Sequence, residues 1–240
     1  MTSKTKDGTF KGLNNNLLKE LGKELNFYEG IPDIFDKTKK LISEDPIYKE
    51  YNIQVEHYVV STGLAQMIRG SIIMEYVESI WGCELIEEEN NDGEMEISQI
   101  GYTIDNTTKT RALFEINKGV NKHKEIKVNS KVPEESRRVR FENMIYIADG
   151  PSDIPAFSLV NRNGGATFAI YPKHDKKAFE QVDNLRKDGR IDMYAEADYR
   201  EGTTAYMWIS NKIIEFAKRI HSSEKQKLID SISDSPKHLN

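Results

Sequence analysis

The segment of residues 145–153, IYIADGPSD, limits the possible folds of this chain more than any other part of it. It begins with a short apolar run that suits a buried β-strand. It continues with Asp, Gly, Pro and Ser, residues that favour turns and helix starts. A plain turn with a helix N-cap has the same composition, but the buried strand in front of it favours a functional loop. The segment therefore predicts a strand whose end carries two carboxylates, Asp149 and Asp153.

Short apolar runs alternate with amphipathic stretches along the rest of the chain. Such alternation indicates a parallel sheet with right-handed crossover helices on its faces. The expected fold class is α/β, a Rossmann-like three-layer arrangement around a parallel sheet. We predict strands over residues 53–61, 80–86, 144–148 and 166–171, an extended excursion over residues 94–102, and helices over residues 33–43, 64–76, 107–118, 154–160, 176–187 and 203–220.

Composition narrows the classes of protein to which the chain can belong. Its 240 residues are 38% hydrophobic and 30% charged, which is typical of a soluble protein with a sizeable core. A formal net charge of −5 argues against a nucleic-acid surface, because phosphate backbones are bound by clustered Lys and Arg. No apolar run approaches the roughly 20 residues that span a bilayer, so we expect no membrane insertion. The single cysteine, Cys83, suits a reducing compartment, and we expect a cytoplasmic location.

Three residues are expected where ligands bind to such a sheet, beyond the carboxyl ends of its strands. Ser61 ends one predicted strand, Asp149 ends another, and Lys109 lies near the start of the helix between them. A phosphoryl-transfer site needs hydrogen-bond donors, a fixed cation and carboxylates that hold Mg²⁺. Alone, Ser61 is more often a strand-end hydroxyl and Lys109 a solvated helix residue. Their order along the chain favours the site.

The roles divide by chemistry. Ser61 is predicted to donate to a phosphate, together with the backbone amides of Thr62 and Gly63 at a helix start. Lys109 supplies the cation. Asp149 is predicted to ligate Mg²⁺, with Asp153 either sharing the metal or orienting the lysine. The expected ligand is a small phosphorylated molecule.

This order of motifs resembles the haloacid dehalogenase superfamily, especially its phosphoserine-phosphatase-like branch, over residues 26–200. VVSTG at residues 59–63 resembles the second motif of that family, and the lysine of TTKTRALFEINKG at residues 107–119 the third. IYIADGPSDIPAFSLV at residues 145–160 resembles the fourth. The resemblance implies Mg²⁺-dependent hydrolysis of a small phosphomonoester through an aspartyl-phosphate.

The first motif of the family, an apolar strand followed by Asp-x-Asp, is not visible in this chain. Asp7-Gly8-Thr9 imitates its end, but Thr5 stands at the nucleophile position. Residues 13–26 resemble the end of the helical cap of this branch, so we expect the nucleophile strand upstream of Met1. Residues 1–30 are then an arm and cap remnant, residues 31–220 the α/β core, and residues 221–240 a polar mobile tail.

The missing strand lies, in the family, in the middle of the sheet between the strands that end at Ser61 and Asp149. A gap there leaves two rows of backbone groups without partners. We expect poor stability, or filling of the gap by self-association or by a complementing N-terminal segment. We expect a haloacid dehalogenase-like phosphohydrolase that is inactive in this chain, because the nucleophile motif is missing. The alternative is a non-catalytic module that binds a phosphorylated ligand or a partner in the retained cleft.

Overall fold

The computed structural model describes residues 11–123 and 125–233, and its fold class is α/β as predicted. The strands are β1 (Tyr58–Leu64), β2 (Ser79–Glu89), β3 (Met95–Tyr102), β4 (Ile145–Ala148), β5 (Ala166–Tyr171) and β6 (Met193–Glu196). The helices are α2 (Asn15–Gly22), α3 (Asp33–Ser43), α4 (Pro46–Glu50), α5 (Ala65–Gly70), α6 (Thr108–Lys118), α7 (Ile154–Arg162), α8 (Lys176–Lys187) and α9 (Thr204–Ser233). None of the described helices is long and apolar enough to cross a membrane.

The described strands form two three-stranded sheets, where the sequence predicted one parallel sheet. The first sheet is mixed: β1 is parallel to β2, and β2 is antiparallel to β3. The excursion predicted over residues 94–102 is therefore a true strand, which returns along β2 after a tight turn at Gly93 (φ 82°). A turn this short can join antiparallel strands only, so the expectation of a purely parallel sheet is wrong for the first sheet.

The second sheet is parallel, in the order β4-β5-β6. Strand β5 lies in its middle and is buried along almost its whole length. Strand β6 was not predicted, because its sequence, MYAE, is short and lacks an apolar run. Asp192 fixes its start: the carboxylate accepts hydrogen bonds from the amide (2.7 Å) and the hydroxyl (2.9 Å) of Thr167 in β5.

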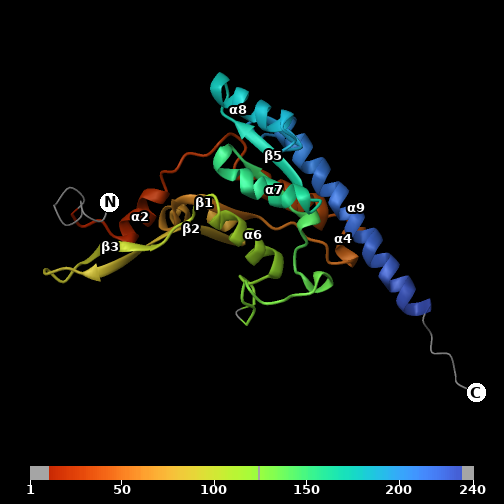
Figure 1. Ribbon diagram of the computed structural model, residues 1–240, viewed down its shortest axis with the longest axis horizontal. Helices are drawn as coiled ribbons and strands as arrows, with labels where there is room; N and C mark the ends of the chain where they lie inside the picture. Colours follow the sequence, from red (N-terminus) through yellow and green to blue (C-terminus); the bar gives the residue numbers. More distant parts are fainter. Residues whose placement is uncertain (1–10, 124, 234–240) are drawn as a thin grey trace, which may run out of the picture.

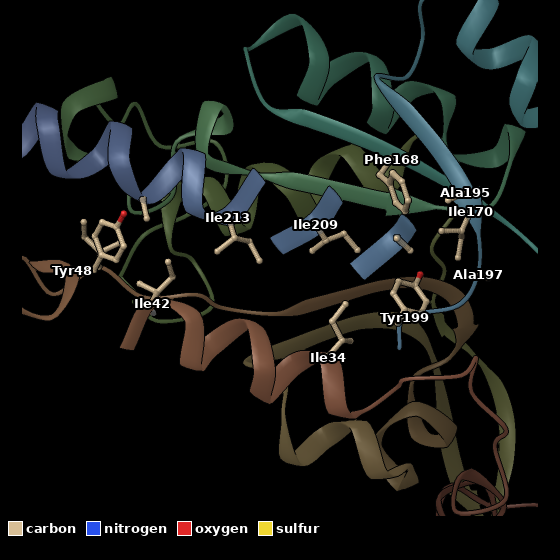
Figure 2. Packing of buried hydrophobic residues seen from close by; sticks show 13 residues of the cluster. Ile34, Ile42, Tyr48, Phe168, Ile170, Ala195, Ala197, Tyr199, Ile209 and Ile213 are labelled. Carbon is tan, nitrogen blue, oxygen red and sulfur yellow. The ribbon is translucent and has the colours of Figure 1, made fainter. Parts of the chain in front are cut away.

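Helices cover both faces of the second sheet. Helices α7 and α8 lie beside β5 on one face, and α9 runs past the sheet on the other (Figure 1). Figure 2 shows Ile34 of α3 facing Ile209 and Ile213 of α9 in the core on this second face. Phe168 points from β5 into the same core and stacks on Trp208 with ring centroids 4.8 Å apart. This three-layer arrangement holds the carboxyl end of β4 in place.

Several predicted boundaries differ from the structure. Strand β1 begins at Tyr58 rather than at residue 53, and it continues to Leu64, so that the predicted helix 64–76 shrinks to α5 and a 3-10 turn, Ile72–Glu75. Helix α9 continues to Ser233, so the predicted helix end at residue 220 is wrong, and residues 221–233 of the predicted tail are helical. Residues 1–10, with Thr5 and the Asp7-Gly8-Thr9 motif, and residues 234–240 lie outside the described residues.

The central position of Phe168 gives a test of this core. We expect Phe168→Ala to lower the free energy of unfolding by about 3–5 kcal/mol, because the change leaves a cavity in a fully buried site. Met207→Ala, at an exposed position of α9, is the matched control and should change it by less than about 0.5 kcal/mol. Urea unfolding measures both. Equal losses in the two variants would contradict the packing described here.

Candidate functional site

A cleft with a volume of about 1030 Å³ lies between the two sheets. Residues of β1 and of β4 both line it, together with residues of α3, α6 and α9. Among the described strands, β1 pairs with β2 alone and β4 pairs with β5 alone. The two strands therefore present their unpaired edges to the same cleft. The carboxyl end of this cleft contains Ser61, Thr62, Lys109, Asp149 and Asp153.

A buried ion pair organises the carboxyl end. The Lys109 ammonium lies 2.7 Å from Oδ1 of Asp153, and the two residues are 6% and 2% exposed. Local structure positions the lysine: the Asp105 carboxylate accepts hydrogen bonds from the amides of Thr107 and Thr108, which fixes the first turn of α6. Asp153 lies at the start of α7, directly after the loop that follows β4. Of its two predicted roles, the contact with the lysine is the one that this geometry supports.

Two hydroxyl groups complete the surroundings of Asp153. Tyr146 donates to Oδ1 at 2.5 Å, and Ser152 donates to Oδ2 at 2.9 Å. Burial, and then the negative charge of Asp153, raises the pKa of Tyr146, so its phenol stays protonated and donates. Both carboxylate oxygens of Asp153 are thus engaged by the chain itself.

Asp149 differs from Asp153 because its carboxylate is exposed at the end of β4. Two tyrosines, Tyr28 and Tyr199, lie within its electrostatic reach. The pKa of Tyr28 is raised by burial first and then by the charge of Asp149. The pKa of Tyr199 is raised by burial first, then by Tyr28 and then by Asp149. The amide of Tyr199 donates to the carbonyl of Glu29 at 2.7 Å, which brings these distant segments together. No sequence motif marks this contact.

The Ser61 segment is placed differently from the prediction. Thr62 and Gly63 belong to β1, and α5 begins only at Ala65, so their amides do not open a helix. The Gly63 amide donates to Oγ of Ser61 at 3.0 Å instead. The Ser61 hydroxyl keeps its proton free to donate into the cleft, because it acts as an acceptor in this contact.

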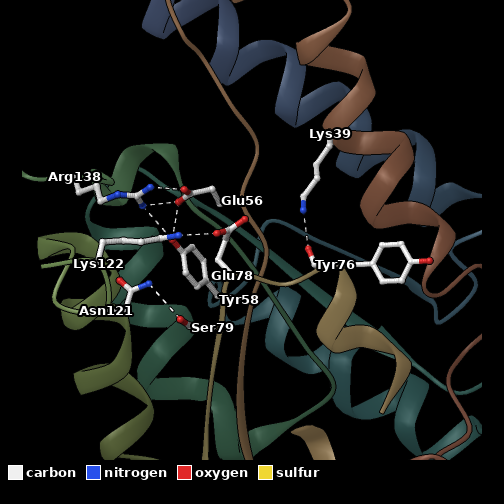
Figure 3. Close-up of polar contacts among 9 residues, drawn as sticks. All are labelled: Lys39, Glu56, Tyr58, Tyr76, Glu78, Ser79, Asn121, Lys122 and Arg138. Carbon is white, nitrogen blue, oxygen red and sulfur yellow. Dashed lines mark hydrogen bonds and ion pairs between the residues drawn. The ribbon is translucent and has the colours of Figure 1, made fainter. Parts of the chain in front are cut away.

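A second polar cluster closes the amino end of the cleft (Figure 3). The Arg138 guanidinium, from the segment before β4, forms a bidentate ion pair with Glu56, which precedes β1. Tyr58 also donates to Glu56, at 2.6 Å. Beside this cluster, Lys122 lies 2.6 Å from Glu78 at the start of β2. The Arg138–Glu56 pair ties the segment before β4 to the segment before β1 across the cleft.

His57 lies next to this cluster and lines the cleft. Its Nε2 is 3.0 Å from the Thr38 hydroxyl, and its ring lies 4.8 Å from the ring of Phe35. Burial, and then the charge of Lys39, lower the pKa of His57 to about 4. The imidazole is therefore neutral at neutral pH.

The described residues contain no group of three or more His, Cys, Asp and Glu side chains that could hold a metal ion. Asp149 offers one free carboxylate. Mg²⁺ in proteins often has one or two carboxylate ligands and completes its shell with water and ligand phosphates. Among the described residues at this end of the cleft, Asp149 alone offers a carboxylate to such a shell, and these residues by themselves form no complete Mg²⁺ site.

The comparisons with known proteins identify one relative. The chain is 37% identical over 221 residues to an uncharacterized protein of Borreliella burgdorferi, and the match covers 87% of this chain and 74% of that protein. No protein-family model matches the chain, and no solved structure matches it. The similarity establishes kinship, and it carries no information on activity or ligand.

The Lys109–Asp153 pair gives a test of the buried geometry. Lys109→Met should lower the free energy of unfolding by about 3–5 kcal/mol, because it leaves a carboxylate buried without its cation. Lys109→Met combined with Asp153→Asn should recover part of this loss, because neither charge remains unpaired. Urea unfolding measures both variants. A loss below about 1 kcal/mol for Lys109→Met is the behaviour of a surface pair and would contradict the burial.

The lowered pKa of His57 predicts a pH dependence of stability. The unfolded chain binds a proton near pH 6.5 and the folded chain near pH 4, so the free energy of unfolding should fall as pH drops between these values. The contribution of His57 to this fall is about 3 kcal/mol. His57→Gln should remove it, and His123→Gln, at an exposed position, should not. Equal slopes for His57→Gln and the unsubstituted protein would refute the assignment.

Proposed function

The chain belongs to the same family as the Borreliella burgdorferi protein, and from the geometry of its cleft we propose that it has a haloacid dehalogenase-like fold that binds a small phosphorylated molecule with Mg²⁺. The observation that carries the proposal is the Lys109–Asp153 pair, buried at the carboxyl ends of the strands. Ser61 and Asp149 line the same end of the cleft. Cation, hydroxyl donor and free carboxylate are thus available to one ligand.

The pair suits a phosphate because Asp153 holds the Lys109 ammonium in place but occupies only one of its hydrogen-bond donors. A lysine ammonium has three donors, and among the described contacts Lys109 uses one of them, toward Asp153. The other two remain for phosphate oxygens. A phosphate monoester carries a charge of about −1.5 to −2 at neutral pH, so it attracts the ammonium and the Ser61 hydroxyl together.

In this proposal, Mg²⁺ binds to the Asp149 carboxylate and to the phosphorylated ligand at the same time. The exposed carboxylate supplies one oxygen, and phosphate oxygens and water supply the others. Asp153 is left out of the metal shell because Lys109, Tyr146 and Ser152 engage its oxygens. Binding of Mg²⁺ and binding of the phosphorylated ligand should therefore each strengthen the other.

Binding without hydrolysis is the activity that we propose for this chain. The aspartyl-phosphate route of the family needs a carboxylate that is free to attack phosphorus. Among the described residues at the carboxyl end of the cleft, Asp149 is assigned to the metal and Asp153 is enclosed by three donors. The other carboxylates that line the cleft belong to segments at its amino end, such as Glu56 and Glu142.

Calorimetry with 4-nitrophenyl phosphate tests the proposal. We expect binding in the millimolar range that strengthens when Mg²⁺ is present. Asp149→Asn should abolish the effect of Mg²⁺, while Asp188→Asn, the same change in a loop beyond α8, should leave it intact. Ser61→Ala should weaken binding about tenfold or more, since a hydrogen bond to a charged group contributes about 1.5–3 kcal/mol.

Two results would overturn parts of this proposal. Absence of any heat of binding, with and without Mg²⁺, would remove the phosphate site altogether. Steady release of 4-nitrophenol that Asp149→Asn abolishes would make the chain a phosphatase in its own right, and the proposed inactivity would be wrong.

A further inference from the structure

We propose that the cleft between β1 and β4 is a docking groove for an extended apolar segment of a separate polypeptide. In the complex, this segment inserts between the two strands and joins the two three-stranded sheets into one. The proposal concerns the walls of the groove and stands independently of the phosphate site at its carboxyl end. An inserted strand is the occupant that both walls require.

The backbone of β4 offers hydrogen-bonding groups to the groove. The Met144 carbonyl accepts from the amide of Ala166 at 2.9 Å, so the groups of Met144 face β5. Successive residues of an extended strand point their backbone groups in opposite directions. The amides and carbonyls of Ile145 and Ile147 therefore face away from β5, toward the groove. No described strand pairs with them.

The side chains of β1 and β4, the two walls of the groove, are less buried than those of a strand that has a neighbour on both sides. In β5, which has a strand on either side, five of the six residues are fully buried. In β4, Tyr146 is buried and the other three residues are half-buried, although Ile145, Ile147 and Ala148 pack against the core clusters. Strand β1 has no fully buried residue, although Val60 packs against the core too. A strand in the groove would cover apolar surface on both walls.

The chemistry of the lining defines the segment. Ile34, Ile42 and Ile213 line the groove from one face, and Leu113 and Ile116 of α6 line it from the other. An inserted strand would meet apolar side chains above and below, so it must be apolar on both faces, as strands in covered parallel sheets are. Its length should match the four residues of β4, with one or two more at either end.

The two ends of the groove set the direction of the strand. The Arg138–Glu56 pair joins the amino ends of β1 and β4, and the Lys109–Asp153 pair lies at the carboxyl ends (Figure 3 shows the former). The walls thus run in the same direction, and a parallel segment can bond to both. The volume of about 1030 Å³ is at the upper limit of small-ligand pockets, about 300–1000 Å³, so a small phosphorylated molecule leaves most of it unfilled.

The occupant must come from outside the sequence shown. Every described strand is already paired elsewhere. The sequences outside the described ends, MTSKTKDGTF and DSPKHLN, contain no run of apolar residues. Insertion of a strand from another chain is an established mode of recognition, in which backbone hydrogen bonds give affinity and side-chain pockets give specificity.

Amide exchange measured by NMR tests the proposal with a synthetic peptide, Lys-Lys-Val-Ile-Val-Phe-Val-Lys-Lys. Saturating peptide should slow exchange of the Ile145 and Ile147 amides by at least about tenfold, because they become ladder donors. The Ile170 amide in β5 is the internal reference. The control peptide has proline at alternate strand positions, and the fixed φ of proline together with the missing amide donors along one edge prevents a regular strand ladder. It should protect these amides far less.

Three outcomes would overturn the docking groove. Unchanged exchange at saturating peptide would mean that no strand inserts. Equal protection by the proline peptide would indicate apolar contact without strand pairing. Protection in the absence of peptide, accompanied by a dimer in light scattering, would mean that a second copy of the chain fills the groove. Asp149→Asn should not alter the effect of the peptide, so loss of the phosphate site leaves this result readable.

Discussion

Backbone groups that are taken away from water need hydrogen-bond partners. This constraint matters most at the cleft between β1 and β4. Strands β1 and β4 pack against the hydrophobic core, yet each pairs with one neighbouring strand among the described residues. An unpaired buried amide or carbonyl costs about as much as a lost hydrogen bond. Two facing rows of such groups line the cleft. The lining of this cleft is the basis of both proposals, the phosphate site at its carboxyl end and the docking groove along its walls.

The two ends of the cleft keep its walls apart and aligned. At the amino end, the Arg138–Glu56 pair joins the segments that lead into β4 and β1. At the carboxyl end, Lys109 reaches from α6 to Asp153, beyond β4. The first pair is partly exposed and contributes little to stability by itself. The second is buried, so removal of either partner leaves an unpaired charge. The proposed phosphate site and the carboxyl end of the cleft therefore both depend on Lys109.

Sequence patterns predicted the regular elements well where one periodicity dominates. Helix α3, helix α8 and strand β5 have the predicted bounds, because their apolar residues follow one clear period. Strand β6 was missed because four residues with a terminal glutamate carry no such signal. The extension of α9 was missed because residues 221–233 have few apolar residues. There, pairs such as Lys227 with Glu224, at 2.6 Å, support the helix.

The sequence predicted which residues line the site better than it predicted their hydrogen-bond partners. Ser61, Lys109, Asp149 and Asp153 do line one cleft, and their roles remain proposals. The partners Tyr146 and Ser152 could not be predicted, because only the turn after β4 brings their hydroxyls onto Asp153. Tyr28 and Tyr199 come from segments that are far apart in sequence.

The most direct test of the central claim, that β1 and β4 are walls of one unfinished sheet, is the pattern of amide exchange along β4 in the chain alone. Exchange should alternate along the strand: the Tyr146 amide, which faces β5, should be protected, and the Ile145 and Ile147 amides should exchange much faster. Uniform protection of all three, at the level of Phe168 and Ile170 in β5, would contradict it, because the edge of β4 would then already have a partner.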